Sequence, residues 1–349
     1  MSVAPSAKPP MIRRLLAASV LIGALGTSMT AGAAPVASGL AWNIVAHSTR
    51  GVLVSDAMLT SGGVRFRAIR LTSGNVLLRW HVGSQDPPGA IGKVPVDARN
   101  AIDWSSEGLA GVLAVFNGGF KIAAHAGGSM ADGVTTAPLV KGDATIALNA
   151  QGRWQMGVWG APGFPSATFR PIAIRQNLAP LVEAGVPTPA ALSPSWSQWG
   201  SPLNYRPAEP RTALGVDAQG NLIYIATMTG VLPSQLARAL ASAGARFGME
   251  LDMNPYWPIL GASTSPLHSP GEMPVQIPGS EHSPSVFFSG WERDFFVAVA
   301  EPVNPSCGWS APGLTSPTAA RPQPLHLEAP ASFAGLAKGV MLQLCQLTP

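Results

Sequence analysis

Charged residues are scarce in this chain of 349 residues. Asp and Glu together number 18, Lys and Arg together number 22, and the formal net charge at neutral pH is +4. Beyond the N-terminal segment, Lys and Arg are not gathered into a basic block, whereas nucleic-acid-binding proteins use such clusters to neutralise phosphates. The charge distribution therefore argues against a nucleic acid as a partner.

Cysteine is nearly absent, and the two cysteines present, Cys307 and Cys345, lie close to the C-terminus. Neither has a second Cys or a His at the spacing of a zinc site, so the pair does not predict a metal centre. In an oxidising compartment the pair predicts one disulfide, which would constrain the unfolded chain by about 4 kcal/mol. Two buried free thiols are the alternative.

Long apolar runs are missing after the N-terminus, so no membrane span is predicted there. Arg13 and Arg14 precede an apolar run over 15–25, and the small residues 31–33 have the pattern of a cleavage site. Residues 1–33 are therefore predicted to be a signal peptide, and the protein to be secreted or otherwise extracytoplasmic. If the segment is not cleaved, it would anchor the protein in a membrane, which is the only membrane contact expected.

Glycine and proline are frequent, with 38 and 34 residues, and this favours many turns and short elements. Strand-like segments separated by turn residues predict an α+β fold, with mixed, mostly antiparallel sheets and packed helices. Segment 222–254 is predicted to be a strand–helix–strand unit whose strands are parallel if they share a sheet. We expect one domain over 34–300 and a Pro-rich extension over 301–349, which the disulfide would hold.

Two hairpins of similar design are predicted at 145–154 and 213–222. Each segment places Asn or Asp, Ala, Gln and Gly between two strand-like runs. The final glycine suits a turn position that requires a positive φ, so each segment should reverse the chain tightly.

Six residues late in the chain, 249–254, alternate strictly between apolar and polar side chains. Successive side chains of a β-strand point to opposite faces, so we expect Glu250, Asp252 and Asn254 to share one face. Two neighbouring carboxylates can divide acid–base or nucleophilic work between them. The alternative is the solvated face of an edge strand.

Two further segments carry candidate site residues. Asn117, Gly118 and Gly119 follow an apolar run that predicts a buried strand. The glycines would let backbone N–H groups approach a ligand, and the asparagine offers a donor and an acceptor. Arg211 and Thr212 open another predicted strand, and a guanidinium suits a phosphate or a carboxylate. The alternatives are a tight turn and a solvated edge arginine.

Taken together, these segments resemble the phosphodiester glycosidase family over about residues 110–260. The run Phe116-Asn117-Gly118-Gly119-Phe120 is similar to the family's Asn-Gly-Gly-Phe segment. The segment 211–217 is similar to its Arg-Thr/Ser-Ala-x-Gly block, and the helix from Pro233 with Leu251-Asp252 to its closing helix and strand.

The closing motif departs from the family pattern. The family reads Asn-Leu-Asp-Gly-Gly-Gly-Ser, whereas this chain reads Glu-Leu-Asp-Met-Asn-Pro-Tyr over 250–256. The Asp is kept at position 252, but the run of glycines and the Ser are absent. This is the pattern of a divergent branch.

The resemblance implies an exported hydrolase that cleaves the glycosidic bond of sugar-1-phosphodiesters in envelope or extracellular glycans, with no cofactor. Asp252 would be the nucleophile or base and Glu250 the second carboxylate, while Arg211 would neutralise the departing phosphate. The residues expected to bind substrate are Asn117, Gly118, Gly119, Thr212, Asn254 and Trp257.

Two other functions fit the same residues. An inactive module of the same fold would bind an envelope glycan, with Tyr256 and Trp257 stacking on its sugars. In the second alternative, the carboxylates of Glu250 and Asp252 would hold Ca²⁺. The sequence identifies neither the sugar nor the group attached to its phosphate.

Overall fold

The computed structural model describes residues 40–104, 111–124, 126–268 and 271–302. The predicted signal peptide, Cys307 and Cys345 lie outside these residues, so signal cleavage and the disulfide stay predictions. No helix in the described part of the chain is long and apolar enough to cross a membrane.

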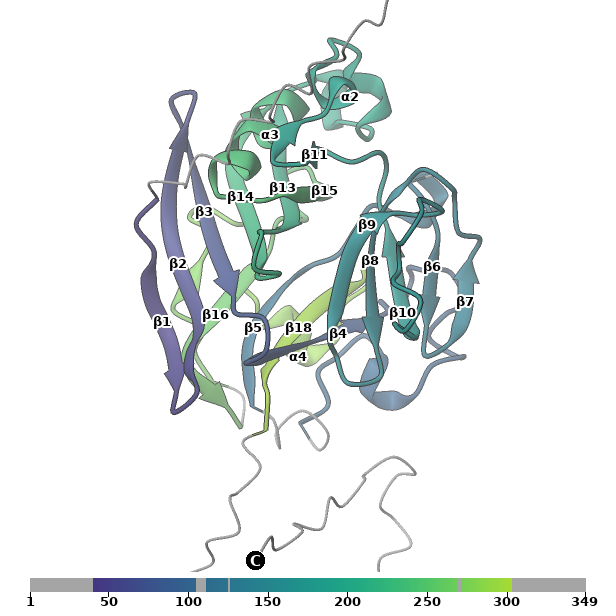
Figure 1. Ribbon diagram of the computed structural model, residues 1–349, viewed down its shortest axis with the longest axis vertical. Coiled ribbons are helices and arrows are strands. Elements are labelled where there is room, and N and C mark those ends of the chain that lie inside the picture. Colours follow the sequence, from purple (N-terminus) through teal and green to yellow (C-terminus); the bar gives the residue numbers. More distant parts are fainter. Residues whose placement is uncertain (1–39, 105–110, 125, 269–270, 303–349) are drawn as a thin grey trace, which may run out of the picture. The chain divides into compact units, whose positions relative to one another are not determined.

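Three β-sheets form the described fold (Figure 1), and all the pairings between their strands are antiparallel. The largest sheet has eight strands, in the spatial order β1 (Asn43–Ser48), β2 (Gly51–Ser61), β3 (Val64–Leu71), β14 (Leu222–Val231), β13 (Glu209–Val216), β15 (Phe247–Met253), β11 (Val182–Glu183) and β12 (Val186–Pro187).

The other two sheets have five strands each. One has the order β7 (Val134–Ala137), β6 (Ser129–Ala131), β10 (Pro171–Gln176), β8 (Ala144–Asn149) and β9 (Trp154–Val158). The other has the order β17 (Val275–Gln276), β16 (Leu260–Leu267), β5 (Val112–Asn117), β18 (Phe295–Ala300) and β4 (Val76–His81).

The prediction of an α+β fold with packed helices is wrong, because the described chain is mostly β. Helix α3 (Pro233–Ser242) has ten residues, whereas α2 (Pro189–Leu192) and α4 (Val286–Ser289) have four each. Proline disrupts a helix interior, so the Pro-rich connections form turns and short 3₁₀ segments instead. These segments are η1 (Val96–Ala98), η2 (Ile122–Ala124), η3 (Trp196–Gln198) and η4 (Leu203–Tyr205).

The strand–helix–strand unit and both hairpins are confirmed. Strands β14 and β15 each pair antiparallel with β13, so they run parallel to one another on its two sides, and α3 connects them. Strands β8 and β9 form the first hairpin and β13 and β14 the second. Gly152 and Gly220 have φ angles of +77° and +81° in their turns, as the turn chemistry requires.

The main hydrophobic core contains residues from all three sheets, including Phe116 of β5, Ile146 of β8 and Leu251 of β15. Helix α3 covers the other face of the large sheet, where its Leu236 and Leu240 are fully buried. The ends of β5 and β15, which carry Asn117 and Asp252, border this packed interior.

Candidate functional site

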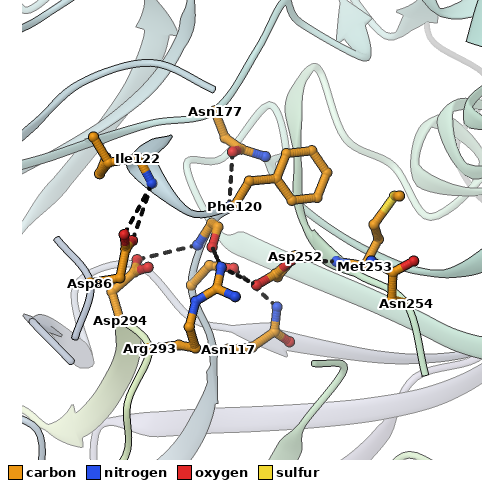
Figure 2. A network of polar contacts seen from close by, with 12 residues as sticks. Asp86, Asn117, Phe120, Ile122, Asn177, Asp252, Met253, Asn254, Arg293 and Asp294 are labelled. Carbon is orange, nitrogen blue, oxygen red and sulfur yellow. Dashed lines mark hydrogen bonds and ion pairs between the residues drawn. The ribbon is translucent and has the colours of Figure 1, made fainter. Parts of the chain in front are cut away.

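The site is built where the end of β5, the end of β15 and the residues before β18 meet (Figure 2). The backbone N–H of Asp252 donates to the Gly118 carbonyl at 2.9 Å, and the Gly118 N–H donates to the Asp294 carbonyl at 2.9 Å. These two backbone hydrogen bonds of Gly118 therefore bring Asp252 and Asp294 close together, although they are 42 residues apart in the sequence.

Asp252 forms an ion pair with Arg293, whose Nη2 lies 2.6 Å from its Oδ2. The same Arg293 nitrogen donates to the Gly119 carbonyl at 3.3 Å, and the guanidinium lies 4.7 Å from the centre of the Trp257 ring. The carboxylate also accepts the N–H of Met253 at 2.9 Å. The pair is thus fixed on both sides by backbone and aromatic contacts.

Solvent reaches this pair and not the two other buried pairs. The side chains of Arg293 and Asp252 are 5% and 7% exposed. Those of Arg175 and Asp294 are 0% exposed, and so are those of Arg211 and Glu250. Asp252 and Arg293 are therefore the charged groups among these three pairs that an external ligand can reach with the least rearrangement.

The Asp252 carboxyl titrates near neutrality. Burial raises its pKa from 3.8 to about 7, against the opposing effects of Arg293 and the Met253 N–H bond. Asp294 adds to the rise, while Arg175 lowers it. A carboxyl group with a pKa close to the ambient pH can act as a proton acceptor or donor, and perturbed groups of this kind gather at functional sites.

Asp294 lies beneath this pair and has a full set of donors. Its Oδ2 accepts from Trp80 Nε1 at 2.9 Å, from Arg175 Nε at 2.9 Å and from the Gly119 N–H at 3.2 Å, and its Oδ1 accepts from Arg175 Nη2 at 3.2 Å. Its lone pairs are occupied by the protein, so Asp294 holds the site together and is not available to a substrate.

Gly118 and Gly119 are required by this packing. A β-carbon on Gly118 would lie 2.0 Å from Asp294 Oδ2, and one on Gly119 would lie 2.8 Å from Arg175 Cζ. The N–H groups that the sequence offered to a ligand both donate to Asp294. The glycines therefore allow the Asp294–Arg175 pair to approach the backbone.

Asn117 and Thr212 support the backbone of Asp252. The Thr212 hydroxyl donates to the Asp252 carbonyl at 2.7 Å, and Asn117 Nδ2 donates to the Thr212 hydroxyl at 3.0 Å. Asn117 Oδ1 accepts from the Tyr224 hydroxyl at 2.7 Å. The predicted residues Asn117, Thr212 and Asp252 thus converge, with the first two acting through hydrogen bonds to the third.

Glu250 and Asp252 do not share one face, contrary to the expectation from their alternation. Arg211 pairs with Met253 and Ala213 with Glu250, so Thr212 alone stands opposite two residues of β15. This β-bulge shifts the register by one residue, which reverses the faces on either side of it.

Glu250 instead forms a fully buried ion pair with Arg211. The Arg211 guanidinium also donates to the carbonyls of Val231, Trp199 and Pro207. With these protein partners and no exposed surface, Arg211 is not positioned to receive a phosphate. Burial raises the pKa of Glu250 from 4.5 to about 7, and Arg211 opposes this rise.

The comparisons with known proteins give distant likenesses only. No family model and no curated protein matches the chain in sequence. The described structure is similar to the catalytic domain of zebrafish N-acetylglucosamine-1-phosphodiester alpha-N-acetylglucosaminidase, auto-inhibited by its pro-peptide. That likeness has a TM-score of 0.44 and 13% identity, and covers 75% of this chain and 88% of that one.

Two other solved structures are also distantly similar. One is a hypothetical protein from Synechocystis, with a TM-score of 0.42, 12% identity, and coverage of 71% of this chain and 62% of that one. The other is a putative exported protein from Burkholderia pseudomallei K96243, with a TM-score of 0.35, 11% identity, and coverage of 71% and 75%. Likeness at this level does not establish a family or an activity.

Asn254 and Trp257, the remaining predicted residues, lie next to Asp252 in the chain. Asn254 has a φ of +76°, and its Oδ1 accepts the Leu203 N–H at 3.1 Å, so it fixes the loop before β13. Trp257 packs against the Arg293 guanidinium. Asn254 thus has a structural contact, whereas Trp257 contacts the charged Arg293 of the candidate site.

The sequence did not single out Arg293, Asp294, Arg175 or Asp86. Arg293 and Asp294 come directly before the apolar run of β18 in a chain with few charges, and that juxtaposition was the available signal. Asp86 lies in a Pro- and Gly-rich loop and accepts the Ile122 N–H through both carboxylate oxygens, at 3.1 and 3.3 Å. Burial raises its pKa above 3.8.

No metal site is evident in the described chain, where no three His, Cys, Asp or Glu residues are grouped to hold an ion. A cavity of about 440 Å³ lies apart from the Asp252–Arg293 pair, since none of the site residues lines it. Its lining includes Trp154, Met156 and Phe164.

Proposed function

We propose that the protein is an exported hydrolase that cleaves the glycosidic bond of sugar-1-phosphodiesters. The observation that carries the proposal is the Asp252–Arg293 pair, in which a carboxyl with a pKa of about 7 adjoins a guanidinium at a solvent-reached position. This reaction needs a carboxylate at the anomeric carbon and a cation at the phosphate, and the pair supplies one of each.

Arg293 takes the role that the sequence suggested for Arg211. Arg211 is fully buried and its guanidinium has four protein acceptors. The Arg293 side chain is 5% exposed, and its buried Nε has no hydrogen-bond partner in the described part of the chain. A phosphate oxygen would satisfy such a donor, and a guanidinium binds phosphate through two parallel N–H bonds.

In the proposed reaction the bond between the anomeric carbon and the phosphate oxygen breaks. The phosphate leaves with the bonding electrons as a phosphate monoester, and its charge is neutralised by Arg293. The oxygen of a water molecule ends on the anomeric carbon, and the ionised Asp252 assists as the nucleophile or as the base that accepts the water proton. A phosphate is a good leaving group, so a strong general acid is less necessary than for ordinary glycosides.

The proposal predicts that Asp252→Asn abolishes turnover of a sugar-1-phosphodiester. Asparagine has nearly the same shape but can neither attack nor accept a proton at this position, and loss of such a group costs about 10²–10⁴-fold in rate. The measurement is release of free sugar by purified wild type and variant, with circular dichroism to show that both are folded.

Asp132→Asn is the matched control, because Asp132 is exposed in the turn between β6 and β7 and asparagine tolerates its positive φ. Unchanged turnover in Asp252→Asn would refute the assignment. If wild type binds glycans but hydrolyses none, the inactive glycan-binding module replaces the enzyme as the better account.

A further inference from the structure

We propose that Lys121, Tyr256 and Trp257 form a second subsite beside Arg293, which binds a second negative charge in the group attached to the phosphate. The inference rests on the proposed function and names a substrate class for it: a glycan or polymer in which anionic groups recur near the cleaved phosphodiester. Lys121 is then a specificity-determining residue rather than a catalytic one.

Trp257 brings the two cations together. Its ring centre lies 4.7 Å from the Arg293 guanidinium and 6.0 Å from Lys121 Nζ. Lys121 follows the loop of Gly118 and Gly119, whereas Trp257 follows the end of β15, so segments from two sheets supply this arrangement. The indole attracts both cations through its negative face.

The two cations differ in their ion-pair partners. Arg293 has a carboxylate partner in Asp252, whereas exposed Lys121 has no ion pair with any described carboxylate. The positive charge of Lys121 is therefore open to an external anion. When a phosphate is bound at Arg293, Lys121 is the neighbouring cation that a second anion in the attached group could reach.

The aromatic side chains add an apolar platform next to the cations. Tyr256 is 50% exposed and lies edge-on to Trp257 with ring centres 6.5 Å apart. Trp291 also belongs to this cluster, with its ring centre 6.1 Å from that of Trp257. Exposed aromatic faces bind the apolar side of sugar rings, so the subsite suits an anionic saccharide better than a small inorganic anion.

The test compares two synthetic sugar-1-phosphodiesters that differ only in the attached group, which is either neutral or carries a further phosphate monoester. Wild type should have the lower KM for the charged compound. Lys121→Gln should raise that KM about fivefold, as expected for one partly solvated charge pair, while kcat and the KM for the neutral compound stay unchanged. Lys121→Arg should retain the preference.

Lys141→Gln is the matched control, because it removes one exposed lysine charge near Gly160 rather than near Trp257. Equal KM values for the two compounds in wild type, or an unchanged KM in Lys121→Gln, would overturn the subsite. If wild type hydrolyses neither compound, the proposed function fails, and calorimetric titration with the charged compound decides the subsite alone. Weaker binding by Lys121→Gln supports it, and equal binding overturns it.

Discussion

At Gly118, one additional carbon atom decides whether the site can be assembled. Its β-carbon would lie 2.0 Å from Asp294 Oδ2, and Asp294 is held by Trp80 and Arg175 in a fully buried pair. We therefore predict that Gly118→Ala lowers the free energy of unfolding by about 2–3 kcal/mol, in the upper range for overpacked interiors. Urea denaturation measures this change.

Gly92→Ala is the control for this substitution, because no atom lies within 4 Å of its β-carbon position. The control should change the free energy of unfolding by less than about 0.5 kcal/mol, as surface substitutions usually do. Equal stability of Gly118→Ala and Gly92→Ala would contradict the packing account of the Asn-Gly-Gly segment.

At the scale of one element, strand β15 shows what the sequence pattern could and could not predict. Its existence and its buried apolar side chains Met249 and Leu251 follow from the alternation. The bulge opposite Thr212 does not, because it arises from pairing with β13 rather than from any local signal. The bulge therefore separated Glu250 from Asp252 in a way that alternation alone could not reveal.

Glu250 makes the stability of the fold depend on pH. Burial raises its pKa from 4.5 to about 7, so between these values the folded protein holds a proton that the unfolded chain releases. The free energy of unfolding should therefore fall as pH rises through this window. Burial likewise raises the pKa of Asp252 from 3.8 to about 7, so Asp252 lowers the free energy of unfolding over the same rise in pH. Denaturant unfolding from pH 4.5 to 7.5 measures the slope.

Glu250→Gln removes the titrating group and should make that slope shallower. Above about pH 7, where Glu250 is ionised, the variant should also be less stable than wild type, because Arg211 then loses its buried anion, and such losses cost about 3–5 kcal/mol. A wild type that becomes more stable from pH 4.5 to 7, or a variant with an unchanged slope, would contradict the assignment of a raised pKa to Glu250.

At the scale of the whole described chain, the strands and hairpins could be predicted, but the relative amounts of helix and strand could not. The strand segments and the unit around α3 followed from periodicity and turn residues. Helix α3 formed and packs on the large sheet, but helices contribute little elsewhere, because the Pro-rich connections became turns and 3₁₀ segments.

Likewise, only part of the candidate site could be predicted from the sequence. Asp252 and its supports, Asn117 and Thr212, were identified because each stands in or next to an apolar, strand-like run. Arg293 completes the ion pair from just before β18, and nothing local in the sequence connects it to β15. Such a partner is fixed by tertiary packing, which brings β5, β15 and β18 to one point.

The position of bond cleavage tests the central claim most directly. Hydrolysis of a sugar-1-phosphodiester in ¹⁸O-labelled water, followed by mass spectrometry of both products, shows which atom the water attacked. If Asp252 and Arg293 act as proposed, the label is found in the released sugar and not in the phosphate monoester. Label in the phosphate monoester would show attack at phosphorus and would contradict the account.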